Sequence, residues 1–201
     1  MTATRRHDDR GQTLPIYIWL TAILLFAALA LFAFAQAASA RNGAQSAADA
    51  AALAAAQDAR DEMLDELLLA IGEGGDWLDW LGDNPPPGTG ASAAAEQLAA
   101  ENDSALLGVQ PAVVNGYPGY EAEIETNYTV GDSIIPGTES MQAKAHATAV
   151  IEPRCDFDPE ADPEKPVELD CDGENVNIDP EDFDPDDLPD ASVMFSVHLA
   201  E

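Results

Sequence analysis

The hydrophobic pattern of the chain begins with an uninterrupted apolar stretch near the N-terminus. No charged residue occurs between Gly11 and Ala40, and the 20 residues of 16–35 are apolar on every face of a helix. A helix of that length spans about 30 Å, which is the hydrocarbon thickness of a bilayer. Thr13 and Pro15 suit the start and the first turn of a helix. The pattern predicts a transmembrane helix over residues 13–38 that contacts lipid through residues 14–37.

A cleaved signal peptide is the alternative interpretation of this stretch. Ala38-Ser39-Ala40 has the small-residue pattern of a cleavage site. The apolar run is nevertheless much longer than the roughly 7–15 residues of an ordinary signal-peptide core. The length therefore favours a retained membrane helix, preceded by a short tail over residues 1–12.

The helical pattern continues beyond the apolar stretch. Residues 41–56 are rich in alanine, the best helix former, and an apolar stripe at helical spacing follows as far as Ile71. We therefore expect one helix over residues 13–71, with residues 39–71 extending out of the membrane. Small side chains allow helices to approach closely. The sequence predicts a helix-assembly face there, made of Ala44, Ala48, Ala51 and Ala55.

Gly72 to Gly75 end this helix, and a short apolar turn with Trp77 and Trp80 follows. The two tryptophans either pack on the domain core or form an interface with a partner or the bilayer surface. A proline-rich loop comes next. Ser92 is then placed to cap a second helix that we expect to run to about Leu107.

From residue 109 the hydrophobic period changes to two. Apolar and polar residues alternate over residues 121–130, 141–151 and 193–199, with turn residues at 116–119 and 135–138. This alternation is typical of antiparallel strands with one buried face. If the first two strands pair in register, Lys144 and His146 face the glutamates of the other strand, Glu121, Glu123 and Glu125.

Residues 155–190 form an acidic, proline-rich insert. They hold 16 acidic residues and one basic residue, and Asp/Glu-Pro repeats disfavour regular structure, so we expect a disordered insert. Cys155 and Cys171 are predicted to form a disulfide, whose 15-residue loop would contribute about 3 kcal/mol; two free thiols are the alternative. Asp170 to Gly173 resembles the start of a Ca²⁺ loop but fails the EF-hand spacing. Weak Ca²⁺ binding and a plain solvated loop both remain open.

The pattern as a whole predicts an α+β fold. A long N-terminal transmembrane helix extends into a small antiparallel-sheet extracytoplasmic domain, made of residues 72–154 and 191–201 and interrupted by the insert. A long helix whose outer half packs on a small antiparallel sheet is also the architecture of pilins, which is an analogy of fold alone.

Charge adds an orientation to this picture. The net charge of the 201 residues is −30, but residues 1–40 carry a net +1 and residues 41–201 a net −31. So acidic a chain is not a general nucleic-acid binder. The topology residues Arg5, Arg6 and Arg10 precede the apolar stretch and Arg41 alone follows it closely. The positive-inside rule then places the N-terminus in the cytoplasm and the acidic domain outside the membrane, as a single-pass protein of the cell membrane.

No recognisable constellation for catalysis is present. The sequence lacks the motifs of nucleophile elbows, zinc proteases, phosphate-binding loops and dinucleotide-binding folds, and its three histidines are scattered. We expect no enzymatic activity, no cofactor and no metal centre.

One segment resembles a known family. Arg10-Gly11 before the apolar stretch, followed by the alanine-rich run of residues 41–56 (RNGAQSAADAAALAAA), is similar to the N-terminal region of Flp pilus-assembly TadE/TadG-like proteins. The resemblance covers about residues 10–60. It implies a membrane-anchored, pilin-like protein without catalytic activity, which works with other components of a Tad-type pilus or secretion apparatus.

The segment departs from one pilin feature. Pilin precursors that are cleaved after a glycine usually carry Glu at the fifth position of the mature chain, and the residue five places after Gly11 is Ile16. The difference argues against processing at Gly11 and favours an assembly component over a filament subunit. The alternative function is a secreted or anchored acidic module that binds Ca²⁺ or cationic cell-wall components.

Overall fold

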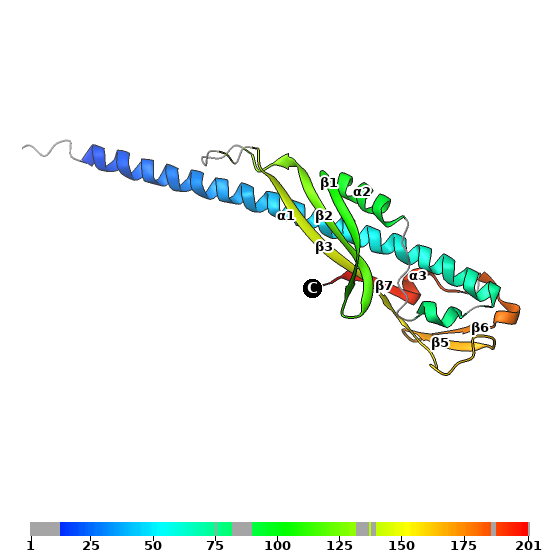
Figure 1. Ribbon diagram of the computed structural model, residues 1–201. Coiled ribbons are helices and arrows are strands. Elements are labelled where there is room, and N and C mark those ends of the chain that lie inside the picture. Colours follow the sequence, from blue (N-terminus) through cyan, green and yellow to red (C-terminus); the bar gives the residue numbers. More distant parts are fainter. Residues whose placement is uncertain are drawn as a thin grey trace, which may run out of the picture.

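The computed structural model describes residues 13–74, 76–81, 90–131, 137, 140–185 and 188–200. A single helix, α1 (Thr13–Glu73), runs through the whole molecule, and its N-terminal part projects alone from the folded domain (Figure 1). The remaining elements gather around its C-terminal part. The predicted architecture, a long apolar helix followed by an antiparallel-sheet domain of the α+β class, is confirmed.

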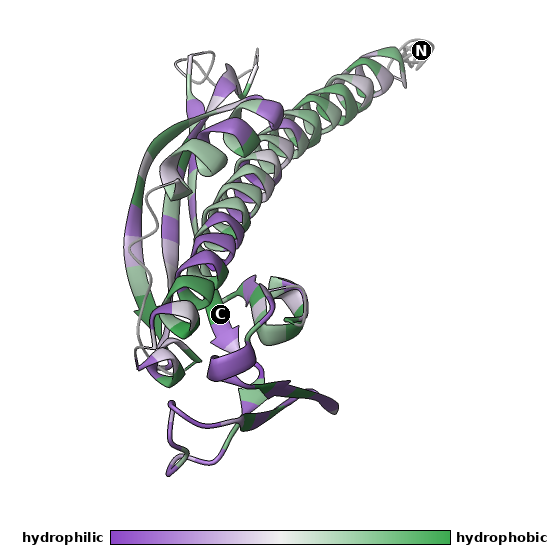
Figure 2. Cartoon of the chain, turned by 90° about the vertical axis from the view of Figure 1, so that its right-hand side faces the viewer, coloured by the Kyte–Doolittle hydropathy of each residue, from purple (hydrophilic) through white to green (hydrophobic). Residues whose placement is uncertain are grey.

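α1 is continuous over 61 residues because its sequence contains few residues that interrupt a helix. It ends where Gly74 adopts a φ of 69°, and the Gly74 N–H donates to the Ile71 carbonyl at 3.2 Å. Glycine adopts this left-handed conformation readily, which suits a helix end. The expected end at Ile71 thus lies within two residues of the observed one. Colouring by hydropathy separates a mostly hydrophobic N-terminal part from a mixed C-terminal part (Figure 2).

The main sheet has four antiparallel strands in the order β1-β2-β3-β7, with bounds β1 (Ser104–Val114), β2 (Tyr117–Thr129), β3 (Gln142–Pro153) and β7 (Phe195–Leu199). Alternate residues of β2 and β3 are buried, and α1 and the helix α2 (Ala91–Glu101) pack on that face. The expected register holds, since Glu125 pairs with Lys144 and Glu123 with His146. The Lys144 ammonium lies 3.5 Å from the Glu125 carboxylate.

The second helix is shorter than the sequence predicts. α2 ends at Glu101, and residues 104–107, which we expected to be helical, begin β1. Asn102 ends the helix because its side-chain amide donates to the Leu98 carbonyl at 2.8 Å, and Asp103 follows with a φ of 51°. Ser92 does not cap the helix either; the N-cap is Gly90 and makes no side-chain cap bond.

The first turn lies two residues earlier than the predicted turn at residues 116–119. Asn115 and Gly116 connect β1 to β2 with φ values of 55° and 92°, as a two-residue hairpin turn of mirror-image type requires. Tyr117, Pro118 and Gly119 already belong to β2. The second predicted turn, residues 135–138, lies outside the described residues except for Gly137.

The acidic insert is not devoid of regular structure, contrary to the sequence-based expectation. It forms a second antiparallel sheet in the order β4-β5-β6, with bounds β4 (Cys155–Asp156), β5 (Val167–Cys171) and β6 (Glu174–Ile178), followed by a short helix η2 (Pro180–Asp182). Val167, Leu169 and Cys171 point into the core while Glu168 and Asp170 are exposed. The insert therefore contributes an apolar face to the domain.

The two sheets are joined around the C-terminal end of α1. Trp77 of the short helix η1 (Trp77–Leu81) is fully buried, and its indole N–H donates to the Pro163 carbonyl of the insert at 3.0 Å. Ile71, Leu169 and Met194 belong to the same core; Met194 ends the short helix α3 (Ala191–Met194) before β7. For Trp77 the core interpretation is correct, and Trp80 packs half-buried against the same cluster.

Candidate membrane-anchoring and assembly surfaces

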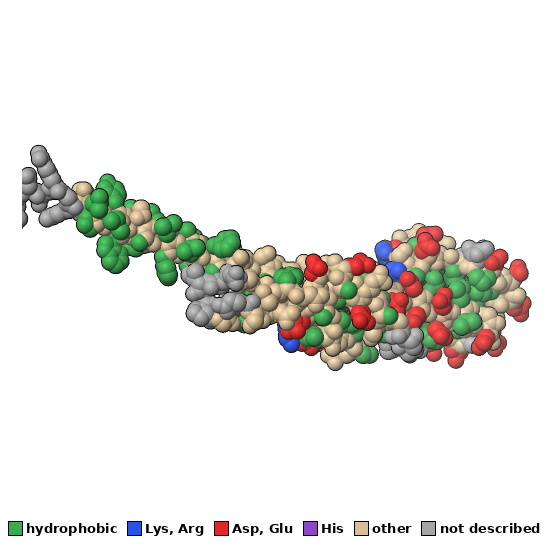
Figure 3. Space-filling model, turned by 90° about the horizontal axis from the view of Figure 1, so that it is seen from above, with side chains coloured by type: hydrophobic (Ala, Val, Ile, Leu, Met, Phe, Trp, Pro, Cys, Tyr) green, Lys and Arg blue, Asp and Glu red, His purple; other side chains and the backbone are tan. Residues whose placement is uncertain are grey.

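The apolar half of α1, residues 13–36, is exposed along its length. The part of this helix that is long and apolar enough to cross a bilayer has none of its residues buried inside the structure. A core helix of a soluble domain would instead be mostly covered. Its large exposed side chains are Leu14, Ile16, Tyr17, Ile18, Trp19, Leu20, Ile23, Leu24, Leu25, Phe26, Leu29, Leu31, Phe32 and Phe34. They project around the isolated helix in the space-filling view (Figure 3).

Ala40 is the first buried residue of α1, and residues 36–38 just before it are partly covered. Ala40 begins the packed half of α1, which we define as residues 40–71. The next residue, Arg41, is exposed. The Ala38-Ser39-Ala40 pattern thus lies inside a continuous helix at the edge of the folded domain. Arg5, Arg6 and Arg10 lie outside the described residues.

The four alanines of the expected helix-assembly face are engaged within the chain itself. Ala44, Ala48, Ala51 and Ala55 are all fully buried and belong to the core that α1 forms with α2, β2 and β3. The small side chains bring the sheet, rather than a second helix, close to the α1 backbone. The chain's own domain therefore covers this face.

Gly43 extends this close packing to the edge of the domain. A β-carbon at Gly43 would lie 2.1 Å from the hydroxyl oxygen of Tyr128, near the end of β2. Glycine at this position lets the tyrosine ring lie directly against the helix backbone. Further along the chain, a β-carbon at Gly131 would lie 3.7 Å from the amide nitrogen of Gln36.

The Glu62 carboxylate of the packed half holds the start of α2. The Gly90 N–H donates to Glu62 Oε1 at 3.0 Å, and Gly90 also lies close to Asp58. Negative charge at a helix N-terminus is favourable. Burial raises the pKa of Asp58, and the negative charges of Glu62 and Asp61 raise it further. The pKa of Tyr120 is raised by its burial and by the charges of Glu62 and Asp58.

The sequence did not predict this acid cluster, which consists of Asp58 and Glu62 with Gly90 and Tyr120 beside them. Asp58 and Glu62 are one helical turn apart and appear as part of a solvated acidic face, while Gly90 and Tyr120 are distant in the chain. The glycine at the start of an alanine-rich helix was the available signal for a helix N-terminus that needs an external acceptor. The cluster joins α1, α2 and β2. Its role is structural, because the Glu62 carboxylate caps the N-terminus of α2.

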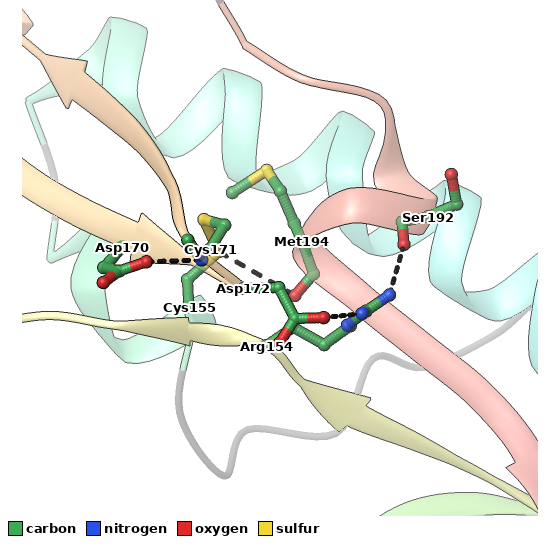
Figure 4. The surroundings of a disulfide bond; sticks show 8 residues. Arg154, Cys155, Asp170, Cys171, Asp172, Ser192 and Met194 are labelled. Carbon is green, nitrogen blue, oxygen red and sulfur yellow. Dashed lines mark hydrogen bonds and ion pairs between the residues drawn. A yellow bond between two sulfur atoms is a disulfide. The ribbon is translucent and has the colours of Figure 1, made fainter.

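The predicted disulfide is present at the far end of the domain (Figure 4). Cys155 and Cys171 lie directly opposite each other on β4 and β5, and the Cys155 sulfur is 3.9 Å from the Met194 carbonyl oxygen. Arg154 forms an ion pair with Asp172 and donates to the Ser192 carbonyl at 3.4 Å. These contacts connect the insert to the segment that leads into β7.

The calcium-like pattern in the insert is a hairpin turn. Asp172 and Gly173 connect β5 to β6 with φ values of 57° and 89°, and Asp170 Oδ1 accepts from the Gly173 N–H at 2.7 Å. The aspartate and glycine therefore serve the turn itself. Among the described residues, no group of three or more His, Cys, Asp or Glu comes together as metal ligands would.

Three surface hollows lined by described residues of the domain are small. They have volumes of about 120, 140 and 200 Å³. Typical small-molecule sites enclose about 300–1,000 Å³. Acidic side chains are spread over the domain and are dense at the end that lies away from the apolar half of α1 (Figure 3).

Comparison with known proteins adds one finding. No curated protein and no solved structure matches the chain. Residues 11–58 match the model of the Tad family, described as Flp pilus-assembly TadE/G-like. The matched segment contains the apolar half of α1 and the first part of its packed half. The resemblance inferred from the sequence over residues 10–60 is therefore confirmed, and over residues 11–58 this chain is similar to the TadE/G-like family of Flp pilus-assembly proteins.

Proposed function

We propose that this chain is a non-catalytic, membrane-anchored, pilin-like component that acts in pilus or secretion-apparatus assembly at the cell envelope. The observation that carries the proposal is the division of α1 into an exposed apolar half and a packed half, with the family match lying across the division. The apolar half holds the protein in the bilayer. The packed half carries an acidic α+β domain outside the hydrocarbon layer.

Charge supports an orientation for this anchor. Arg5, Arg6 and Arg10 on the N-terminal side outnumber Arg41 on the other side, so the N-terminus stays in the cytoplasm and the domain lies outside. The disulfide between Cys155 and Cys171 suits an oxidising compartment. The continuous helix around Ala38-Ser39-Ala40 and the burial of Ala40 support retention of the apolar half in the mature protein.

The absence of Glu five residues after Gly11 supports an assembly role over a filament subunit. Partners in the membrane meet the apolar half, because Ala44, Ala48, Ala51 and Ala55 are covered by the domain. Partners outside the membrane meet the acidic surface of the domain.

Fractionation of cells that produce the protein with a C-terminal epitope tests these assignments together. We expect the full-length chain in the membrane fraction, with the epitope degraded by protease added to spheroplasts but not to intact cells. Recovery mainly in sheared surface filaments would overturn the assembly role. Recovery from the medium with Arg41 as the new N-terminus would overturn the anchor.

A second experiment tests the pilus or secretion assignment. Photo-crosslinkers placed at exposed positions of the apolar half, such as Leu25 and Leu29, should capture other membrane proteins of the assembly apparatus in the native host. The same crosslinker at Leu69 provides the matched control, because that leucine is also exposed but belongs to the packed half, away from the bilayer. Capture of lipid alone at both positions of the apolar half would contradict a lateral assembly role.

A further inference from the structure

The ends of β2 and β3 form a projecting arm beside α1. β1 begins at Ser104, opposite Thr126 of β2, and the Asn127 N–H still donates to the carbonyl of the preceding Asp103 at 2.8 Å. β2 and β3 continue without β1 toward the apolar half of α1 (Figure 1). The ladder between them persists, because the Val130 N–H donates to the Met141 carbonyl at 2.9 Å. The arm is defined here as residues 127–131 and 140–142.

Two contacts fix the level of the arm along α1. Tyr128 lies against Gly43, and Gly131 lies near Gln36. The three residues from Tyr128 to Gly131 span about 10 Å as a strand, and the seven residues from Gly43 to Gln36 span about 10 Å as a helix. The two lengths agree, so the arm runs alongside α1 toward the membrane segment.

The side chains of the arm differ from those on the rest of the sheet. Along the solvent face of β2 and β3, charged residues Glu121, Glu123 and Lys144 alternate with the buried positions. Residues 127–131 and 140–142 contain no charged residue, and in the sequence Asp132 and Glu139 stand directly next to them. Within the arm, Met141 is 55% exposed and Tyr128 is 39% exposed. Tyrosine and apolar side chains are typical of the interface between a membrane and water.

We propose that this arm is a second membrane contact, which lies in the headgroup layer of the outer leaflet when α1 spans the bilayer. The inference rests on the membrane anchoring proposed above. The lipid-contacting stretch ends at about residue 37, and Gly131 is level with Gln36. A segment in contact with the end of a membrane-spanning helix meets the bilayer surface there. The headgroup layer is about 5–8 Å thick on each side, which is the level of Val130 and Met141.

This contact has a consequence for the domain. One helix alone leaves an exported domain free to tilt about the point where it leaves the bilayer. A second point of contact, attached to α1 through the Tyr128–Gly43 packing, restricts that tilt. The arm therefore holds the acidic domain at a set angle to the membrane plane.

Depth-dependent fluorescence quenching tests the arm in the full-length protein reconstituted in phosphatidylglycerol–phosphatidylethanolamine vesicles. The two native cysteines are joined in a disulfide, so a single introduced cysteine can be labelled selectively. Met141→Cys reports the arm. Val113→Cys, at a residue that is 68% exposed beside the distant β1–β2 turn, is the matched control, and Leu25→Cys reports insertion of the apolar half.

We expect a quencher at the lipid headgroup to reduce the emission of the Met141→Cys label several-fold more than that of the Val113→Cys label. A quencher deep in the acyl chains should act mainly on the Leu25→Cys label. If the Leu25→Cys label is quenched but the Met141→Cys and Val113→Cys labels behave alike, the arm proposal is overturned and anchoring stands. If no quencher in the lipid affects the Leu25→Cys label, the anchoring itself is overturned.

Discussion

The apolar half and the packed half of α1 share one continuous backbone but have opposite side chains and surroundings. The apolar half carries large side chains such as Leu25 and Phe32, which are exposed in the isolated chain. The packed half carries alanines such as Ala48 and Ala51, which are fully buried although they are the smallest side chains with a β-carbon. Burial is thus greatest where the helix is least hydrophobic per residue.

This contrast shows that hydrophobicity alone does not locate the core of this protein. Lipid tails adapt to any apolar shape, so the apolar half needs area rather than fit. A folded sheet packs at crystal-like density, so the packed half needs small residues at fixed positions.

The largest effect is expected from enlarging the alanines of the packed half. The triple variant Ala48→Leu, Ala51→Leu, Ala55→Leu places large side chains in a fully packed core, where each overpacked position costs about 1–3 kcal/mol. We expect the domain to lose most of its stability, measured in detergent micelles by the thermal transition of tryptophan fluorescence, to which the buried Trp77 contributes.

The matched control is the triple variant Ala27→Leu, Ala28→Leu, Ala30→Leu in the apolar half, whose positions are exposed. This variant should leave the thermal transition of the domain unchanged. Equal destabilisation by both triple variants would show that the two halves do not differ in packing. Unchanged stability in both would show that the alanine face is not part of the core.

Opening the disulfide is expected to have the next largest effect. The double variant Cys155→Ser, Cys171→Ser releases a loop of 15 residues, and the chain-entropy estimate gives a loss of about 3 kcal/mol. The loss should appear as a lower denaturation midpoint of the domain. Helical content of the apolar half, measured by circular dichroism in micelles, should not change.

Reductant provides the internal control for this prediction. It should lower the midpoint of the native protein to that of the double variant and leave the double variant unaffected. If reductant lowers the midpoint of the double variant as well, the effect does not come from this disulfide.

A smaller effect is expected at the boundary between the halves. Gly43→Ala places a β-carbon 2.1 Å from the Tyr128 hydroxyl oxygen, so the tyrosine must shift, and we expect a loss of about 1 kcal/mol. Tyr128→Phe removes that oxygen, and the next atom of the ring is 3.4 Å from the same β-carbon, an ordinary contact. In the double variant the better helix propensity of alanine should then raise stability by up to about 1 kcal/mol.

The free energies of unfolding of the native protein, the two single variants and the double variant are compared by chemical denaturation. A change of sign for Gly43→Ala between the two backgrounds is the expected result. Additive effects of the two substitutions would contradict direct packing of Tyr128 on Gly43, and with it the level that we assign to the arm.

Much of this architecture was predictable because its patterns are local. The apolar length, the alanine-rich continuation and the alternation in β2 and β3 each follow from side-chain period. The cysteine pair was predictable from an even count on an exported chain. The partner of the alanine face was not, because small residues permit close approach to a helix or a sheet equally well, and only the tertiary fold decides between them.

The prediction of a disordered insert was wrong because it relied on the acid and proline content and not on the order of the residues. Val167, Leu169 and Cys171 alternate with acids at a period of two, and Asp172-Gly173 is a hairpin signal. The prolines of the insert lie outside β5 and β6 and do not interrupt them. The predicted end of the second helix was wrong because local pattern outweighed tertiary pairing. Residues 104–107 continue an apolar helical pattern, but in the fold they pair with β2.

The smallest effect is expected where charge, rather than size, distinguishes the halves. Asp58 in the packed half has a raised pKa because of burial and the nearby charges of Glu62 and Asp61, whereas the apolar half contains no acid. A carboxyl whose pKa is higher in the folded state binds its proton more tightly there than in the unfolded chain. Its ionisation therefore costs stability as the pH rises from its ordinary pKa of 3.8 through the raised value.

Asp58→Asn removes that cost and the like-charge pair that Asp58 forms with Glu62 at helical spacing. At pH 7 we expect a gain of about 0.2–0.5 kcal/mol, the magnitude of one such pair. The gain should disappear below pH 3.8, where the Asp58 carboxyl is protonated in both the folded and the unfolded chain. Asp65→Asn, on the same half at a position whose side chain is exposed, is the control and should show a smaller gain at pH 7. Denaturation midpoints that shift equally for both variants across pH 3–7 would show that the gain reflects the net charge of the domain, and that the packing of the acid cluster against α2 contributes nothing to it.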